Sequence, residues 1–482
     1  MSIRLPIFFS IVLAGIAALG CAAFAAERPP NIVLVVGDDL GWGDPRCYNP
    51  DSRIPTPSMD RLSSEGMRFT DAHAPSALCT PTRYGLLTGR YAWRTRLQRG
   101  TLVGDSRALI EPGRTTVASF LRGRGYATAG VGKWHLGLGD VEPADYTKPL
   151  RPGPLDCGFD RFFGIPASLD MAPYLFFEGD RAVEPPTGRI GASEMRRKGG
   201  GGFWRAGGIA PGFTHEGCLP ALVAWAEEFL RRQEPAKPFF LYFPLTAPHT
   251  PWMPLKGFRG KSGADWYGDF VAQVDDALGR VLRVLEEKKL SENTLVLFMS
   301  DNGAHWLPED IEKHRHRANG PWRGQKGDIW EGGHRVPLIV RWPGCVKAGS
   351  TSEALVCLTD LMATVAEIVG GDLPRDAAED SSSFLPVLLG KGPAPRRGMV
   401  LHSGDGGFAI RDGPWKLCLT LGSRGFSNPK DPKPVPGGPK GQLYHLGDDP
   451  SETRNLYLEK PAEVARLEAI LEKARSEGRT RP

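Results

Sequence analysis

Short apolar runs that alternate with helix-like segments constrain the fold of this chain more than any other feature. Five such runs are typical of buried strands: Asn31–Val36, Ala127–Val131, Phe239–Phe243, Leu295–Met299 and Leu338–Arg341. Helical periodicity occurs at Thr115–Arg124, Leu219–Arg232, Tyr267–Lys288 and Leu358–Val369. This alternation predicts an α/β fold in which a large, mostly parallel sheet is sandwiched by helices.

The sequence pattern changes near residue 396. Short strand candidates at Met399–His402, Gly407–Arg411 and Trp415–Leu419 are spaced as hairpins, and Pro461–Arg475 has the pattern of a helix. We therefore expect one large domain over residues 26–392 and a small C-terminal α+β domain with a short antiparallel sheet over residues 393–482. Ser423–Gln442 is rich in Pro, Gly and Lys, and we interpret it as a surface loop rather than a functional element.

Residues 1–25 have the pattern of a secretory signal peptide. Arg4 precedes an apolar run that ends in small residues at Ala23-Phe24-Ala25. The pattern predicts a protein that is secreted or periplasmic after cleavage. A membrane anchor is one alternative, and lipid attachment at Cys21, in an imperfect lipoprotein box, is another. No other stretch of the sequence is apolar enough to predict a stable membrane span.

The charge and cysteine content exclude some functions. The net charge of +5 is small for 482 residues; it permits anionic substrates without showing a preference, and no nucleic-acid partner is expected. No Cys-x-x-Cys pair or Cys/His cluster suggests a zinc site. Cleavage of the signal peptide would leave seven of the eight cysteines, an odd number that implies at least one unpaired sulfur.

Polar residues follow four of the predicted strands where each one ends. They are Asp38-Asp39, Lys133 with His135, His249, and Asp301-Asn302. Open α/β sheets place their sites outside the carboxyl ends of their strands, so we expect these side chains to share one site.

The oxygen donors at these strand ends suit Ca²⁺ or Mg²⁺: the carboxylates of Asp38, Asp39 and Asp301 and the amide oxygen of Asn302. Carboxylates crowded together would repel one another and take up protons unless a cation compensated them. Helix capping or turn formation is the alternative for the Asp38-Asp39 pair taken alone. The arrival of Asp301-Asn302 at the same sheet edge favours the metal site.

Cys79 lies in a second motif, Cys79-Thr80-Pro81-Thr82-Arg83. Pro81 fits the first turn of a helix, which places residue 79 at the positive end of the helix dipole. This position favours an anionic nucleophile or a bound anion, and Arg83, one turn along, can neutralise its charge. A buried structural cysteine is the alternative that the spacing alone leaves open.

Two motifs resemble signatures of the formylglycine-dependent sulfatase family, an arylsulfatase-like family of the alkaline-phosphatase-like superfamily. Cys79-x-Pro81-x-Arg83, continuing through Leu87-Thr88-Gly89, matches the signature in which the Cys becomes formylglycine. Gly125-Tyr126 through Gly132-Lys133-Trp134-His135 is similar to the second signature. The resemblance covers roughly residues 30 to 345, and this chain is of the Cys type rather than the Ser type.

The resemblance implies a hydrolase of sulfate esters whose nucleophile is made by oxidising Cys79 to formylglycine. Ca²⁺, in preference to Mg²⁺, would be bound by the hydrated residue 79 with Asp38, Asp39, Asp301 and Asn302. The sulfate would be surrounded by Arg83, Lys133, His135, His249 and Lys326, and Ser168 is similar, more loosely, to a family serine near the sulfate. The implied partners are a sulfated saccharide or other sulfate ester and a formylglycine-generating or radical maturation enzyme.

We assign His249, assisted by Lys326, as the acid that protonates the leaving alcohol, and His135 as the base that acts on residue 79. Asp301 is a candidate proton acceptor. Glu331–Arg335 is interpreted as a turn outside the catalytic set. A sulfated carbohydrate is favoured because the protein is predicted to be exported and has basic, aromatic loops. A phosphonate or phosphate ester substrate, and a non-catalytic binder of sulfated glycans in which Cys79 stays a thiol, remain as alternatives.

Overall fold

The structure, a computed structural model, describes residues 29–193, 204–393 and 396–481. The predicted signal peptide, including Cys21, lies outside these described residues. Within the described ranges, every helix is too short or too polar to cross a bilayer.

A 10-stranded sheet forms the large layer of the molecule, in the order β13-β2-β12-β11-β1-β10-β4-β5-β6-β7. Its middle strands, from β11 to β5, all pair parallel, whereas β12 and β6 pair antiparallel with their inner neighbours. The mostly parallel sheet predicted from the sequence is therefore confirmed. The bounds are β1 Asn31–Asp38, β2 Met67–Phe69, β4 Ala127–Lys133, β5 Arg161–Ile165, β6 Phe177–Glu178, β7 Arg181–Ala182, β10 Phe239–Pro248, β11 Thr294–Ser300, β12 Leu338–Arg341 and β13 Ser350–Ser352.

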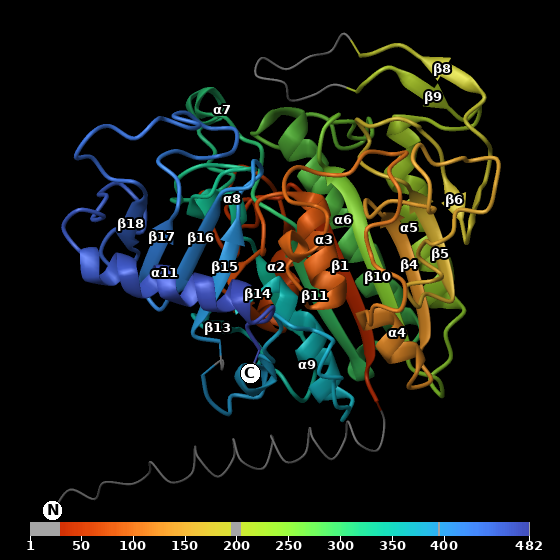
Figure 1. The fold of residues 1–482 in the computed structure, drawn as a ribbon. Coiled ribbons are helices and arrows are strands. Elements are labelled where there is room, and N and C mark those ends of the chain that lie inside the picture. Colours follow the sequence, from red (N-terminus) through yellow and green to blue (C-terminus); the bar gives the residue numbers. More distant parts are fainter. Residues whose placement is uncertain (1–28, 194–203, 394–395, 482) are drawn as a thin grey trace, which may run out of the picture.

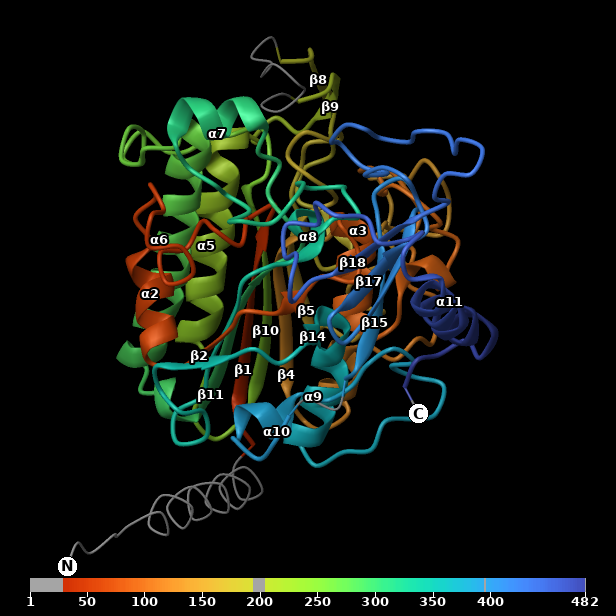
Figure 2. The same cartoon turned by 90° about the vertical axis from the view of Figure 1, so that its left-hand side faces the viewer.

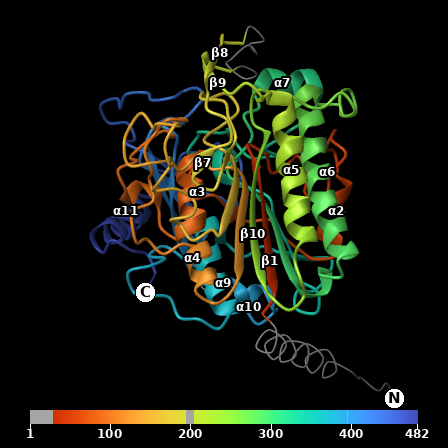
Figure 3. The ribbon, with the colours of Figure 1, turned by 90° about the vertical axis from the view of Figure 1, so that its right-hand side faces the viewer.

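Helices cover both faces of this sheet, as Figures 1, 2 and 3 show. One face carries α2 (Pro57–Ser64), α5 (His215–Arg231) and α6 (Asp265–Glu287), and the other carries α3 (Cys79–Thr88), α4 (Val117–Arg122) and α9 (Leu361–Ile368). In α6, apolar residues recur at helical spacing, so one face of the helix packs on the sheet. The short helices are α7 Pro308–His314, α8 Glu331–His334, α10 Leu385–Leu388, η1 Ala92–Arg94, η2 Ser291–Asn293 and η3 Leu358–Asp360.

A separate four-stranded antiparallel sheet lies near the C-terminus and is blue in Figure 1. Its strands are β15 Gly398–His402, β16 Phe408–Asp412, β17 Trp415–Cys418 and β18 Gln442–His445, and α11 (Pro461–Ser476) packs on β16 and β17. The predicted short antiparallel sheet is therefore confirmed, while the boundary at residues 392 and 393 stays a prediction. Two small ribbons complete the strands: β3 Ala72–His73 with β14 Val356–Cys357, and β8 Gly188–Ile190 with β9 Gly207–Ile209.

The strands that lead to the candidate site extend further than their apolar runs. β1 continues through Gly37 to Asp38, and β4 continues to Lys133. The apolar pattern ends earlier because these last positions are glycine or charged, yet the pairing with neighbouring strands extends to Asp38 and Lys133. α5 begins at His215 rather than Leu219, because Thr214 caps it by accepting a hydrogen bond from the amide of Gly217.

His402, at the end of β15, gives a prediction for the stability of the folded chain. Burial, with a smaller effect of Arg475, lowers the pKa of His402 to about 4, below its ordinary value of 6.5. The unfolded chain therefore binds this proton at higher pH than the folded chain, so the associated stability is complete above pH 6.5 and is lost as the pH falls towards 4. By pH 5 we expect a loss of about 2 kcal/mol from this group.

Urea unfolding at pH 7.5 and pH 5 measures this effect. A His402→Gln variant, which cannot titrate, should lose less stability between the two pH values than the unmodified chain. Equal losses in both proteins would contradict the assignment of this acid sensitivity to His402.

Candidate functional site

The carboxyl ends of β1, β4, β10 and β11 bring together the polar residues that were selected from the sequence. The Lys133 ammonium, at the end of β4, lies 2.9 and 2.8 Å from the two carboxylate oxygens of Asp38, at the end of β1. The amide of Asp39 donates to Asp301 Oδ1 at 3.1 Å, just past β11. Nε2 of His249, directly after β10, lies 3.6 Å from Asp39 Oδ2. The predicted convergence at one sheet edge is present.

Three buried carboxylates in this cluster each face a cationic side chain. Lys133 contacts Asp38, Lys326 Nζ donates to Asp39 Oδ2 at 2.6 Å, and Arg83 donates to Asp301 Oδ2 at 2.7 and 3.0 Å. Burial penalises the ionised form of Asp38 and Asp39, but the neighbouring cations, chiefly Lys133 and Lys326 respectively, hold the pKa of each below its ordinary value. For Asp301, the effect of burial is larger than the opposing effect of the Arg83 charge, and the pKa is raised to about 6.

The donor set in this cluster suits a hard divalent cation. Ligand atoms of Asp38, Cys79 and Asp301 lie within 4.8 Å of one another, as do those of Asp38, Asp39 and His249, and all are buried. Asn302 donates its side-chain amide to Asp39 Oδ1 at 2.7 Å, while its buried Oδ1 has no hydrogen-bond partner. Carboxylate and amide oxygens are what Ca²⁺ prefers, so these residues fit the ion.

Cys79 is the first residue of α3, a helix buried along its whole length. No side chain caps the N-terminus of this helix, so residue 79 lies at the positive end of the helix dipole. Burial raises the pKa of the Cys79 thiol, although Lys133 and Lys326 act in the opposite direction. The thiol is therefore protonated at neutral pH and is a weak nucleophile in this form.

Hydrogen bonds to backbone carbonyl groups fix the ring orientation of the two histidines in the cluster. His135 Nε2 lies 2.8 Å from the carbonyl oxygen of Leu102 and therefore carries the proton, so the buried Nδ1, which has no partner, is free to accept one. Burial, with Lys133 and Arg83, holds the pKa of His135 well below its usual range. His249 Nδ1 donates to the carbonyl of Thr250 at 2.7 Å, which directs Nε2 towards Asp39.

Two of these residues have left-handed backbone conformations, which are uncommon in residues other than glycine. Asp39, directly after β1, has φ of 64°, and His135, two residues after the end of β4, has φ of 56°. Left-handed conformations in residues with a side chain are uncommon and cluster where a site requires a particular side-chain direction.

A pocket of about 1030 Å³ opens over this cluster, and Cys79, His249 and Lys326 line it. Its other lining residues include several that sequence reasoning missed, among them Asp170, Asp405 and Phe426. Asp170 Oδ1 lies 3.9 Å from His249 Nδ1. These residues belong to no recognisable motif and do not directly follow a predicted strand. They reach the pocket on loops that are far apart in the sequence.

Ser168 lies near the cluster but does not line this pocket. Its segment is connected to the site because the amide of His135 donates to the carbonyl of Pro166 at 2.9 Å. The Ser168 hydroxyl is buried and has no hydrogen-bond partner. Its substrate-binding role stays a prediction.

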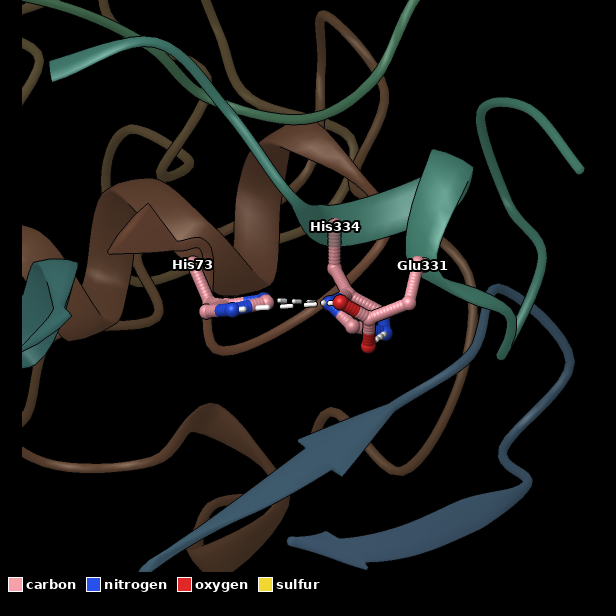
Figure 4. A group of neighbouring side chains, drawn as sticks. All are labelled: His73, Glu331 and His334. Atoms are coloured by element: carbon pink, nitrogen blue, oxygen red, sulfur yellow. Dashed lines mark hydrogen bonds and ion pairs between the residues drawn. The ribbon is translucent and has the colours of Figure 1, made fainter. Parts of the chain in front are cut away.

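A second buried cluster contains His73, Glu331 and His334, whose ligand atoms could hold a metal ion (Figure 4). The two Nδ1 atoms of the histidines lie 3.0 Å apart. However, Lys416 Nζ already lies 3.0 Å from both Glu331 Oε1 and His334 Nε2, so an ammonium group occupies the cation position beside them. Further charged residues balance the cluster: Asp71, Arg335, Arg411 and Glu452. We interpret it as an ionic network.

This network joins the small sheet to the ribbon of β3 and β14, because Lys416 lies on β17 and His73 on β3. The segment interpreted from the sequence as a turn is instead the helix α8, and its side chains are the centre of the network. The spacing of Glu331, His334 and Arg335 by three and four residues was the signal for a shared helical face.

Comparisons with known proteins identify the family of this chain. A family model described as Sulfatase matches residues 30–371. The N-acetylgalactosamine-6-O-sulfatase of Bacteroides thetaiotaomicron is 34% identical over 492 residues, which cover 93% of this chain and 94% of the relative. Arylsulfatase A of Homo sapiens is 35% identical, with 90% and 85% covered.

Solved structures give the same result. A structure reported for the metabolism of multiple glycosaminoglycans by Bacteroides thetaiotaomicron has a TM-score of 0.83 and 32% identity, and the match covers 93% of this chain and 100% of that chain. A sulfatase from Pseudoalteromonas sp. has a TM-score of 0.75 and 26% identity, with 97% and 96% covered. The chain therefore belongs to the sulfatase family, with the alkaline-phosphatase-like fold, and is a sulfuric ester hydrolase.

Proposed function

We propose that this enzyme hydrolyses sulfate esters of saccharides with a formylglycine made from Cys79 and with Ca²⁺ held by Asp38, Asp39, Asp301 and Asn302. The observation that supports this most is the buried set of three carboxylates and three cationic side chains beside Cys79, at the N-terminus of α3. The protonated thiol of Cys79 also favours a nucleophile other than sulfur.

The two added groups would each supply one kind of chemistry. Bound Ca²⁺ would act as a Lewis acid that polarises oxygen atoms at residue 79 and on the sulfate. The aldehyde, once hydrated, would offer one hydroxyl to attack sulfur and a second that allows sulfate to depart, so that the nucleophile is regenerated.

The cationic side chains of the cluster bind and orient the sulfate group. Arg83, Lys133 and Lys326 offset the charge on the sulfuryl oxygens as the ester bond breaks, and burial strengthens their effect. Their fixed contacts with the carboxylates keep them in position before the substrate arrives.

The two histidines move the protons. His249 donates a proton from Nε2, which points towards Asp39, to the oxygen of the leaving alcohol, and Lys326 assists. His135 accepts a proton from residue 79 at Nδ1, which has no hydrogen-bond partner and carries no proton while Nε2 donates to Leu102. General acid or base help of this kind typically contributes about 10²–10⁴ in rate.

A sulfated saccharide is the substrate class that the comparisons support. Relatives from two lineages carry names for the removal of a 6-sulfate from N-acetylgalactosamine. The pocket volume of about 1030 Å³ leaves room for a sugar beyond the sulfate. We further propose that the protein is exported and that a formylglycine-generating or radical maturation enzyme acts on Cys79.

Paired substrates with one leaving group test this function against the phosphoryl alternative. We expect kcat/KM for 4-nitrophenyl sulfate to exceed that for 4-nitrophenyl phosphate, together with sulfate release from N-acetylgalactosamine 6-sulfate. Removal of metal by a chelator should abolish both sulfatase reactions, and Ca²⁺ should restore them better than Mg²⁺ does. Faster turnover of the phosphate ester, or full activity after chelation, would contradict the proposal.

A further inference from the structure

The pocket over the cluster receives part of its wall from the C-terminal region of the chain. Beyond Cys79, His249 and Lys326, its lining includes Gly404, Asp405 and residues 425–428. Residues 425–428 belong to the Pro/Gly/Lys loop that was interpreted from the sequence as a surface loop without a function. The part of a substrate that extends beyond the sulfate therefore meets side chains of this loop.

Phe426 is the aromatic side chain that this loop contributes to the pocket, and 51% of its surface is exposed. The ring of His305, which also lines the pocket, lies 5.4 Å from it between ring centroids. Ligand pockets are typically lined by aromatic side chains together with a few polar groups that set orientation. An exposed ring inside the pocket is thus available for contact with a ligand.

Hydrogen bonds fix Phe426 to the turn that carries Lys326. The buried carboxylate of Asp328 accepts hydrogen bonds from the amides of Phe426 and Ser427 through Oδ1, at 2.7 and 3.0 Å. Its Oδ2 accepts from the amide of Gln325 at 2.9 Å. The aromatic ring and the Lys326 ammonium are therefore held by one short segment.

Gly327, between Lys326 and Asp328, allows the close packing of this loop. A Cβ atom at Gly327 would lie 3.4 Å from three atoms of the Phe426 ring, so the ring lies flat above this position. Gly327 has φ of 85°, and its carbonyl accepts from the amide of Gly404 at 2.7 Å. Phe426 is thus positioned in advance, which reduces the entropy lost when a ligand binds.

We propose that Phe426 forms the subsite for the sugar ring of the leaving alcohol, with Asp405 as an acceptor for its hydroxyl groups. This inference rests on the proposed function. A pyranose ring has a face of C–H groups that packs against an aromatic ring, and hydroxyl groups around its rim that donate to a carboxylate. The carboxylate of Asp405 forms a long ion pair with Lys430, whose Nζ lies 3.8 Å away.

A Phe426→Ala variant tests the subsite. We expect kcat/KM for N-acetylgalactosamine 6-sulfate to fall about tenfold, mainly through KM, which corresponds to about 1.4 kcal/mol of lost contact. Phe426→Trp should retain most of the activity. Inhibition by inorganic sulfate, which occupies only the anion site, should keep its constant in both variants. Val435→Ala is the matched control, because Val435 is an exposed apolar residue of the same loop that does not line the pocket.

The outcomes separate this inference from the proposed function. If the unmodified enzyme releases sulfate from the saccharide and Phe426→Ala does so within twofold, the subsite is wrong while the function stands. A weaker inhibition by inorganic sulfate in Phe426→Ala, equal to its loss on the saccharide, would indicate a disturbed anion site and would also overturn the subsite. If the unmodified enzyme acts on 4-nitrophenyl sulfate but on no sulfated saccharide, the saccharide proposal fails and this inference fails with it.

Discussion

Replacing Cys79 with alanine should lower turnover of every sulfate ester by at least about 10⁵-fold, the scale seen when an enzyme loses its covalent nucleophile. The expected result follows from the position of residue 79, which is the first residue of α3 and faces the Lys133 and Lys326 ammonium groups. Without an oxygen nucleophile there, the cationic side chains can still bind sulfate but have no reaction to assist. Initial rates with 4-nitrophenyl sulfate and with a saccharide sulfate measure the loss.

The folded state should change little in this variant, which separates a chemical loss from misfolding. The substitution removes one buried sulfur atom, so the thermal midpoint should fall by only a few degrees. Peptide mass spectrometry of the unmodified protein provides the direct control. The peptide that contains residue 79 should be lighter than its cysteine form and should resist alkylation. A fully alkylated Cys79 in an active preparation would contradict the proposed nucleophile. A fully alkylated Cys79 in a folded preparation without sulfatase activity would favour a protein that binds sulfated glycans without hydrolysing them.

The strands of the fold and the centre of the site could be predicted because both follow from local patterns. A strand buried on both faces needs a continuous apolar run, and the first polar residue after it marks the edge of the sheet, as Asp38-Asp39 after β1 illustrates. The carboxyl ends of parallel strands meet at the same edge of the sheet, so Asp301 and Lys133 could be placed in one site from the sequence alone. The pairing of each carboxylate with a cation was not predictable, because it depends on side-chain directions at the sheet edge.

The outer wall of the pocket could not be predicted, because it depends on contacts between segments far apart in the sequence. Phe426 lies in a loop whose composition indicated only exposure, and the hydrogen bonds from its backbone to Asp328 cross about a hundred residues of chain. The network around Glu331 was missed for the same reason, since Lys416 reaches it from the small sheet. Local periodicity gives no information about which loop covers a site.

Replacing His249 with glutamine should lower turnover by an amount that depends on the leaving group. His249 lines the pocket, and its Nε2 lies 3.6 Å from Asp39 Oδ2. A sugar alcohol is a poor leaving group and needs the proton, so turnover of a saccharide sulfate should fall by about 10²–10⁴. A nitrophenolate leaves without protonation, so 4-nitrophenyl sulfate should lose less than about tenfold.

A series of aryl sulfates whose leaving groups differ in pKa measures this dependence as a slope. The logarithm of kcat/KM should fall more steeply with leaving-group pKa in the His249→Gln variant than in the unmodified enzyme, because the lost proton donor matters more as the leaving group becomes more basic. Phe426→Ala is the useful comparison, since a variant that only weakens sugar contact should leave the slope unchanged. Parallel lines for His249→Gln would show that this residue is not the acid, and Lys326, which also lines the pocket and contacts Asp39, would then be the next candidate for that role.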